Sequence, residues 1–411
     1  RPEDLETVIG DYSLLVGKSP DNQVLHYQLG RAYRAKGDQD KAWSELQAAT
    51  RDTRTYLAPR LSLAEVSAER GMYDETLRYL DEILRVDTRN PNVRWLRAAT
   101  LRNLGRNDDA RQELLTLIRD HPNEANYHLE LGLLNLAAGR HKDAEAIFAK
   151  WYRPGAEDVR PVVGLAQAAA AQGDHDRAIA LLEKEAQLRP EDVGPRRLMA
   201  EIAAGANRIP LALKLYEEIL ARSPDDPKSR VALGQLLIGQ GETDRGLSHL
   251  AAAAHAAADN ATVQLSYATA LDLAGRADQA RSVYRAALAR DRNNPATLNN
   301  YAYFCARTDS DLDEALRMAQ RAAQQAPENA SFADTLGFVY LKRGMTDSAL
   351  QVFRSLVVRE PGNPTFRLHL AMALAKKGRA AEAVRELKEA LARRPSAQEQ
   401  QEIERLLASL G

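Results

Sequence analysis

The residues of this chain best suited to acid–base, nucleophilic or metal chemistry are its eight histidines and its single cysteine. A helix presents two imidazoles on one face when they stand four residues apart, as zinc-dependent hydrolases require. The closest pairs here, His249 with His255 and His121 with His128, have other spacings. We therefore expect the histidines to be surface or groove residues, and we predict no metal site.

Paired carboxylates are the second candidate for chemistry. Asp108 with Asp109, and Asp225 with Asp226, stand beside turns, where acidic side chains commonly cap helices. The sequence has no G-x-x-x-x-G-K-[ST], no G-x-G-x-x-G after a strand, no H-E-x-x-H and no G-x-S-x-G. We predict no catalytic residue and no cofactor, and we expect that the protein is not an enzyme.

The cysteine, Cys305, stands in the apolar run YAYFCA, which predicts a small buried core residue. A reactive thiol is the alternative that the sequence leaves open. One cysteine forms no internal disulfide, and it is compatible with a reducing or an oxidising compartment. The location is therefore open between the cytoplasm and the periplasm.

Charge and hydropathy narrow the class of partner. Charged residues make up 27% of the chain, yet the formal net charge is −1. This balance predicts no chain-wide cationic field and therefore no nucleic-acid partner. No apolar run approaches the ~18 residues of a membrane span, and no signal-peptide pattern occurs at the start.

The helices expected around these candidate residues belong to one sequence unit that recurs along the chain, most clearly at residues 330–363. Its marker residues are Leu336, Gly337, Tyr340, Gly344, Ala349, Phe353 and Pro361. Their spacings are those of the tetratricopeptide repeat, a helix–turn–helix unit of 34 residues, and the chain resembles that family. Ala333 departs from the pattern, because the family often has Trp there.

The register of the repeats follows from the residue at which two helices of a hairpin meet. A small side chain is needed there so that the helix backbones approach closely. Eleven first helices supply one: Gly30, Ala64, Ala98, Gly132, Ala166, Ala200, Gly234, Ala268, Ala302, Gly337 and Ala371. The second helices have small residues at Ala42, Thr76, Ala110, Ala144, Ala178, Ala212, Gly246, Ala280, Ala315, Ala349 and Ala383. Gly, or Asn207 in the sixth repeat, stands at the turn of most hairpins.

This register predicts an all-α fold, and the resemblance implies a right-handed superhelical solenoid of tetratricopeptide hairpins. We predict a half-repeat over residues 1–22, eleven repeats in one continuous solenoid over residues 23–395, and a C-terminal capping helix over residues 396–411. Because the chain opens at Arg1 in mid-repeat, we expect that a preceding segment with a signal, an anchor or further repeats is missing.

Three places break the pattern. Arg97 stands where the other repeats have an apolar residue, and a side chain that reaches out to solvent is expected there. Residues 150–161, KWYRPGAEDVRP, predict a local change of pitch. The turn of the ninth repeat, RTDSDLDEA, has one extra residue and no Gly.

The resemblance also implies a function. Proteins of the tetratricopeptide family are interaction scaffolds, and their first helices line a concave groove that holds a peptide or a helix of a partner. Residue by residue, the groove positions of that family correspond here to Asn299, Tyr303, Arg307, Asp334, Phe338, Lys342, Tyr27, Arg31, Arg34, Trp95 and Arg102. We expect the stronger hot spot at Asn299, Tyr303, Asp334 and Phe338. The alternative is that both rings only pack between neighbouring repeats.

Three alternatives accompany this prediction. Arg31 and Arg34 resemble fragments of a clamp for a terminal carboxylate, but Leu61 and Glu65 follow where further ligands belong. Pentatricopeptide repeats, which read RNA, are disfavoured by the near-neutral charge. The chain resembles long bacterial arrays, so a scaffold in an envelope, secretion or polysaccharide-assembly system is the first interpretation. The second is the recruiting arm of a larger enzyme, such as a glycosyltransferase.

Overall fold

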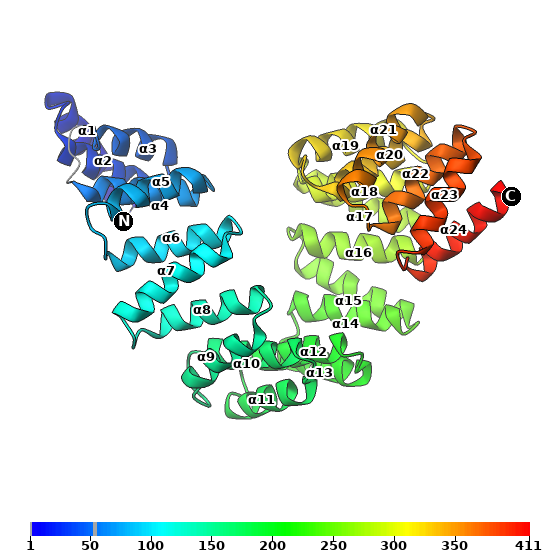
Figure 1. Cartoon of the computed structure of the whole chain (residues 1–411), viewed down its shortest axis with the longest axis horizontal. Coiled ribbons are helices and arrows are strands. Elements are labelled where there is room, and N and C mark those ends of the chain that lie inside the picture. The colour runs from blue at the N-terminus through cyan, green and yellow to red at the C-terminus, as the bar shows by residue number, and fades with distance from the viewer. Residues whose placement is uncertain (1, 52–55) are drawn as a thin grey trace. The chain divides into compact units, whose positions relative to one another are not determined.

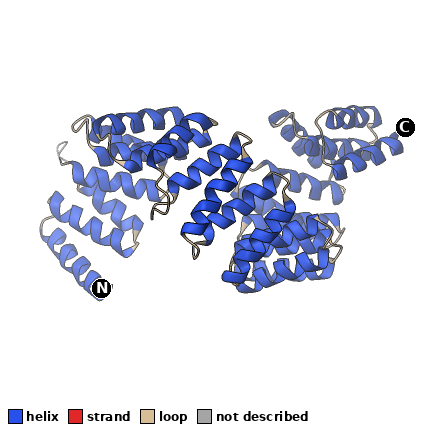
Figure 2. Ribbon diagram, turned by 90° about the horizontal axis from the view of Figure 1, so that it is seen from below, coloured by secondary structure: helices blue, strands red, loops and turns tan. Residues whose placement is uncertain are grey.

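The computed structural model describes residues 2–51 and 56–411. Arg1 of the predicted half-repeat and residues 52–55 of the first repeat lie outside the described residues. The described chain contains 24 α-helices and no strand (Figure 2). The predicted all-α fold is therefore confirmed.

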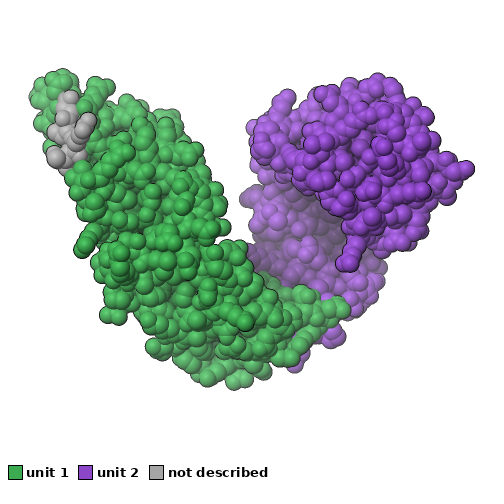
Figure 3. Space-filling view, viewed as in Figure 1, with its two compact units in different colours: residues 1–208 green, residues 209–411 purple. Residues whose placement is uncertain are grey.

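The helices form two compact units, residues 1–208 and residues 209–411, which Figure 3 colours separately. The boundary falls inside the predicted sixth repeat. Unit 1 contains α1 (Pro2–Lys18), α2 (Gln23–Lys36), α3 (Gln39–Ala48), α4 (Leu57–Glu69), α5 (Tyr73–Leu84), α6 (Pro91–Asn103), α7 (Asn107–Asp120), α8 (Ala125–Ala137), α9 (His141–Trp151), α10 (Arg160–Ala171), α11 (His175–Leu188) and α12 (Val193–Gly205). Unit 2 contains α13 (Ile209–Arg222), α14 (Pro227–Gly239), α15 (Thr243–Ala256), α16 (Ala261–Leu273), α17 (Ala277–Arg290), α18 (Pro295–Arg307), α19 (Leu312–Gln325), α20 (Ala330–Lys342), α21 (Thr346–Arg359), α22 (Pro364–Lys376), α23 (Ala380–Leu391) and α24 (Ala397–Leu410).

Within each unit the chain runs as helical hairpins that stack on their neighbours in sequence order (Figure 1). The small residues predicted at the hairpin contacts are buried in all eleven first helices and all eleven second helices. Close approach is needed at these sites. A Cβ atom added at Gly337 would lie 2.6 Å from the Phe353 ring, and one added at Gly30 would lie 2.8 Å from Leu46 Cγ.

The turns inside the hairpins have the expected left-handed backbone. All nine predicted glycines have φ between 72° and 86°, and Asn207 has φ of 59°. The longer turn of the ninth repeat reaches the same geometry without glycine, since Asp309 and Asp311 have φ of 50° and 49°. Asp tolerates this region better than most residues because its short side chain forms local hydrogen bonds.

A recurring hydrogen bond that we did not predict joins consecutive repeats. In six repeats, a basic residue four positions before the small residue of the first helix contacts the backbone carbonyl six residues earlier. The pairs are His26 with Pro20, Arg94 with Thr88, His128 with Pro122, Arg196 with Pro190, Arg230 with Pro224 and Arg367 with Pro361. The bond satisfies a carbonyl of the inter-repeat turn and fixes the start of the next helix.

The two ends of the array differ. In α1, Ile9 is buried against Leu29 and Ala32 of α2, but the apolar Val8 and Leu15 of the same helix are 39% and 43% exposed. At the other end, α24 occupies the predicted residues and packs on α22 and α23, with Ile403 fully buried. Ser396 and Glu399 form a capping box that fixes the start of this helix.

The break after the fourth repeat is a structured turn. Helix α9 ends at Trp151, and Glu185 of α11, 1% exposed, lies against the turn that follows. Its Oε2 accepts hydrogen bonds from the Tyr152 hydroxyl at 3.4 Å and from the Gly155 N–H at 3.3 Å. The buried carboxylate of Glu185, on the second helix of the next repeat, thus satisfies one side-chain donor and one backbone donor of this turn.

Candidate functional site

Three of the four expected hot-spot residues, Asn299, Tyr303 and Asp334, line one cavity of about 450 Å³ in unit 2, and the fourth, Phe338, is not part of its lining. Its walls come from the first helices of four consecutive repeats, α16, α18, α20 and α22, with single contributions from α17, a loop and α24. Its lining includes Asp272, Leu273, Asn299, Tyr303, Arg307, Asp334 and His369. The structure therefore brings Asn299, Tyr303, Arg307 and Asp334 together as the repeat register predicted.

Two aromatic rings from adjacent repeats meet beside this cavity. The ring centroids of Tyr303 and Phe338 are 5.4 Å apart, and Phe338 also lies 5.1 Å from the His369 ring. The two rings differ in solvent exposure, since Phe338 is 6% exposed and Tyr303 is 37% exposed. Phe338 is therefore packed between repeats, while Tyr303 is partly exposed at the cavity, and Leu273 of the same lining is 72% exposed.

Asn299 of the cavity lining has one buried polar atom that makes no hydrogen bond to the described residues. The residue is 7% exposed, and its Nδ2 donates to Asn300 Oδ1 at 3.2 Å. Its Oδ1 is buried and has no hydrogen-bond partner among the described residues. Buried acceptors are rarely left unsatisfied, so this oxygen is a candidate acceptor for a bound molecule.

Asp334 makes a contact that we did not predict. Its Oδ1 lies 2.8 Å from Nδ1 of His369, and both residues are buried. His369 stands two positions before the small Ala371, as Asn300 and Thr335 stand before Ala302 and Gly337. The shared register places all three on the cavity wall, and this repeat position was the available signal.

The cations at the edge of the cavity are already engaged. Arg307 forms an ion pair with Asp272. Lys342 Nζ lies 3.6 Å from Asp309 Oδ2 and 5.7 Å from the centroid of the Phe338 ring. Neither is free to receive an anion without giving up a partner.

A second cavity, of about 610 Å³, lies in unit 1 and contains the predicted basic end of the groove, Tyr27, Arg31 and Arg34. Arg34 is paired with Glu65 and, at 2.5 Å, with Glu69. The Arg31 guanidinium lies 5.7 Å from the centre of the Tyr27 ring. Since Glu65 lines the same cavity, the carboxylate clamp suggested by the arginines meets a competing carboxylate.

The predicted residues of the third repeat, Trp95 and Arg102, line neither of these two cavities. The Trp95 ring packs 5.4 Å from Tyr127, and Arg102 is paired with Glu130 of α8. Both residues therefore contact the adjacent repeat, and they are not brought together with the other site residues.

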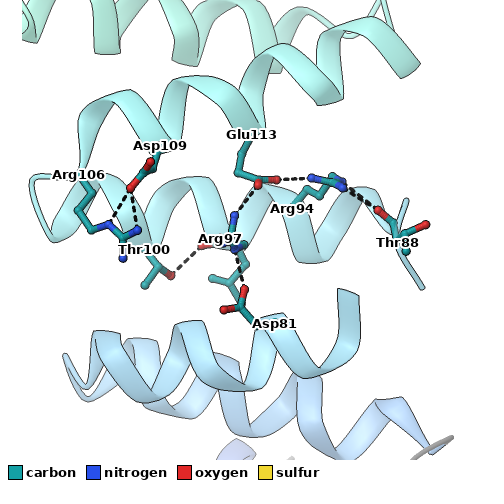
Figure 4. Close-up of polar contacts among 9 residues, drawn as sticks. Asp81, Thr88, Arg94, Arg97, Thr100, Arg106, Asp109 and Glu113 are labelled. Atoms are coloured by element: carbon teal, nitrogen blue, oxygen red, sulfur yellow. Dashed lines mark hydrogen bonds and ion pairs between the residues drawn. The ribbon is translucent and has the colours of Figure 1, made fainter. Parts of the chain in front are cut away.

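The same repeat contains a charged network that crosses three helices (Figure 4). Arg97 of α6 donates to Asp81 of α5 at 2.9 Å and to Glu113 of α7, which is 8% exposed. Arg94 donates to the second oxygen of Glu113 at 2.6 Å. Arg97 thus does not reach out to solvent as expected, because a buried carboxylate on the next helix holds it.

Glu45 and Glu386 stand at the same repeat position as Glu113, and each pairs with the basic residue of its own first helix.

The cysteine has the predicted core position. Cys305 is fully buried, and burial raises the pKa of its thiol to about 11.

Over residues 2–51 and 56–411 there is no group of three or more His, Cys, Asp or Glu side chains placed to hold a metal ion. None of the helices in that part of the chain has the length and apolarity needed to cross a membrane.

Comparison with sequence families gives matches over more than half of the chain. Two family models described as tetratricopeptide repeat match residues 96–159 and residues 169–236, 203–268, 237–307 and 340–410. No curated protein sequence matches the chain significantly.

Comparison with solved structures finds similar chains at low sequence identity. The chain is similar to yeast Tom70, with a TM-score of 0.50 and 15% identity, over 99% of this chain and 92% of that chain. It is also similar to a chain of the APC/C hetero-tetramer Cut9–Hcn1, with a TM-score of 0.48, 14% identity and coverage of 98% and 94%. A tetratricopeptide repeat protein from Parabacteroides merdae matches with a TM-score of 0.49, 20% identity and coverage of 63% and 98%.

Proposed function

The chain belongs to the tetratricopeptide repeat family, and from this premise we propose that it binds a segment of a partner protein in the unit 2 cavity. Its general role is that of a protein–protein interaction scaffold, and its family and fold are usually non-catalytic. The bound segment is a peptide or a helix that lies against the first helices of the eighth to eleventh repeats.

The observation that carries this proposal is the combination of exposed apolar surface with an unsatisfied acceptor in one cavity. Leu273 and Tyr303 are 72% and 37% exposed, and both line this one cavity. Asn299 Oδ1 lies beside them without a partner among the described residues. An aromatic anchor with nearby polar groups is the usual composition of a binding hot spot.

The unit 1 cavity supports this function less well. Arg34 is paired with two carboxylates, and the cavity wall carries Glu65 itself. A partner would have to break those pairs before it gained a contact. We therefore place the primary site in unit 2.

A display experiment tests the proposal. Peptides are selected from a random displayed library on the immobilised chain and then measured against variants. Leu273→Glu places a charge on the apolar rim and is expected to abolish binding of most selected peptides. Val358→Glu is the matched control, because Val358 is 82% exposed but belongs to α21, a second helix that does not line the cavity.

The result also decides between the two cavities. Peptides that bind equally to the chain and to Leu273→Glu, but lose binding to Arg31→Ala, would move the site to unit 1. A selection that yields no peptide above background would contradict peptide binding by either cavity.

For the wider setting, we propose a bacterial envelope, secretion or polysaccharide-assembly system. The supporting observation is the long array rich in alanine and arginine. Fractionation of cells that produce the full-length protein tests this setting, and recovery outside the envelope and periplasm fractions would contradict the first two systems.

A further inference from the structure

We propose that the unit 2 cavity receives a basic side chain, arginine or lysine, of the bound segment. The inference rests on the groove function proposed above and adds the chemistry of the residue that the groove selects. Three features of the cavity carry it: its charge balance, its unsatisfied acceptor and the ring of Tyr303.

One carboxylate of the cavity lining has no lysine or arginine partner among the described residues. Among the lysines, arginines and carboxylates of the cavity lining, Asp272 is matched by Arg307 in an ion pair. Asp334 contacts the His369 imidazole through one oxygen and forms no ion pair with a lysine or arginine among the described residues. The nearby lysines are occupied, Lys342 near Asp309 and Lys376 by the Leu341 carbonyl at 2.8 Å. A cation on the ligand would therefore complete a pair that the chain leaves open.

The carboxylate and the exposed ring face the same space. Burial, and after it the negative charge of Asp334, raises the pKa of the Tyr303 phenol. Tyr303 and Asp334 also line the same cavity, so the two groups lie near each other. A ligand group that contacts the exposed part of Tyr303 is therefore also within the field of Asp334.

The unsatisfied acceptor favours a ligand group that only donates. Asn299 Oδ1 is buried without a partner among the described residues. Ammonium and guanidinium groups have donors and no acceptor, so they can bond to this oxygen and to Asp334 together. A carboxylate ligand would add a third negative charge and leave the amide oxygen unsatisfied. A purely apolar side chain would cover both acceptors without satisfying either.

The remaining surface suits the rest of a long basic side chain. A cation over an aromatic face gains electrostatic attraction, and Tyr303 offers 37% of its surface for this contact. The methylene stem of Lys or Arg packs on apolar surface while its charge stays among polar groups. Leu273, 72% exposed, supplies that surface at the edge of the cavity.

Immobilised peptide pools test the inference. Each pool has randomised flanks and one fixed central residue, which is Arg, Lys, Gln, Leu or Glu. We expect the chain to retain the Arg and Lys pools about fivefold more strongly than the Gln and Leu pools, with the Glu pool weakest, since one ion pair of ~1 kcal/mol corresponds to this factor.

Two variants connect the preference to the cavity. Asp334→Asn keeps the size of the side chain and an oxygen for His369 but removes the charge, so the basic preference should disappear. Tyr303→Leu keeps apolar area and removes the ring, so retention of the Arg and Lys pools should fall while that of the Leu pool is unchanged. Asp347→Asn is the control for charge removal, because Asp347 is an exposed residue of α21 paired with Lys377.

Circular dichroism melting confirms that each variant is folded, and Tyr303→Leu keeps the test open if Asp334→Asn fails to fold. Retention of all pools without a basic preference, or with an acidic one, overturns the inference and leaves the groove function intact. A basic preference that survives both variants also overturns it. Retention of no pool contradicts the groove function itself and the inference with it.

Discussion

Gly234 and Gly246 face each other across the hairpin of α14 and α15 at backbone contact distance. A Cβ atom added at Gly234 would lie 2.8 Å from the Gly246 carbonyl oxygen, and one added at Gly246 would lie 2.5 Å from the Gly234 oxygen. Other repeats have alanine at one or both of these positions. The paired glycines therefore let these two helices approach more closely than an alanine at either position would allow.

Gly234→Ala should destabilise the protein by roughly 1–3 kcal/mol, because the methyl group meets backbone that cannot move aside. Gly239→Ala, at the end of the same helix, is the matched control, since a Cβ there meets nothing within 4 Å. It should stabilise by up to ~1 kcal/mol through helix propensity. Urea unfolding followed by circular dichroism measures both, and equal effects would contradict the close contact.

The network around Glu113 predicts opposite results for two substitutions. Glu113→Ala leaves Arg94 and Arg97 beside each other without their shared carboxylate and should cost roughly 3 kcal/mol or more. Arg97→Leu restores an apolar residue like those of the other repeats and should change the free energy of unfolding by less than ~1 kcal/mol. A large loss with Arg97→Leu would show that the arginine is needed for more than charge matching.

Cys305 predicts a loss of stability at alkaline pH. Burial raises its thiol pKa above the ordinary value of 9.0 to about 11. Between these values the unfolded chain releases a proton that the folded chain keeps, so the stability contributed by this group is complete below pH 9.0 and is lost as pH rises through about 11. Urea unfolding across this range should show less of this decrease in Cys305→Ala. Tyr284 and Tyr301, whose pKa values burial also raises, act in the same direction in both proteins. Rapid labelling of the folded thiol near pH 8 would contradict the burial argument.

The repeat register predicted the small helix contacts and the hairpin turns. The small residues, the turn glycines and Asn207 were found because the same physical need recurs in each hairpin at a fixed place. Partners in adjacent helices or repeats were harder to identify. Glu113 pairs with Arg97 of another helix, and Glu185 accepts a hydrogen bond from Gly155 in a preceding turn. Both contacts depend on side-chain directions that periodicity does not specify. His369 lies 35 residues from Asp334, a spacing that a search one repeat along the chain would have found.

The last prediction separates the two rings at the centre of the proposed site. Phe338 is 6% exposed and packs on Tyr303 and His369, so Phe338→Ala should cost roughly 3–5 kcal/mol of folding stability. Tyr303 is 37% exposed, so Tyr303→Ala should cost clearly less stability and should instead weaken binding of the display-selected peptides by ~2 kcal/mol or more. Thermal unfolding measures the first effect, and fluorescence anisotropy with a labelled selected peptide measures the second. Phe338→Leu, which keeps most of the buried volume, should recover much of the lost stability and serves as the control for packing. If Tyr303→Ala lowers stability as much as Phe338→Ala and leaves peptide affinity unchanged, Tyr303 is a packing residue, and the Tyr27 and Arg31 cavity of unit 1 becomes the better candidate.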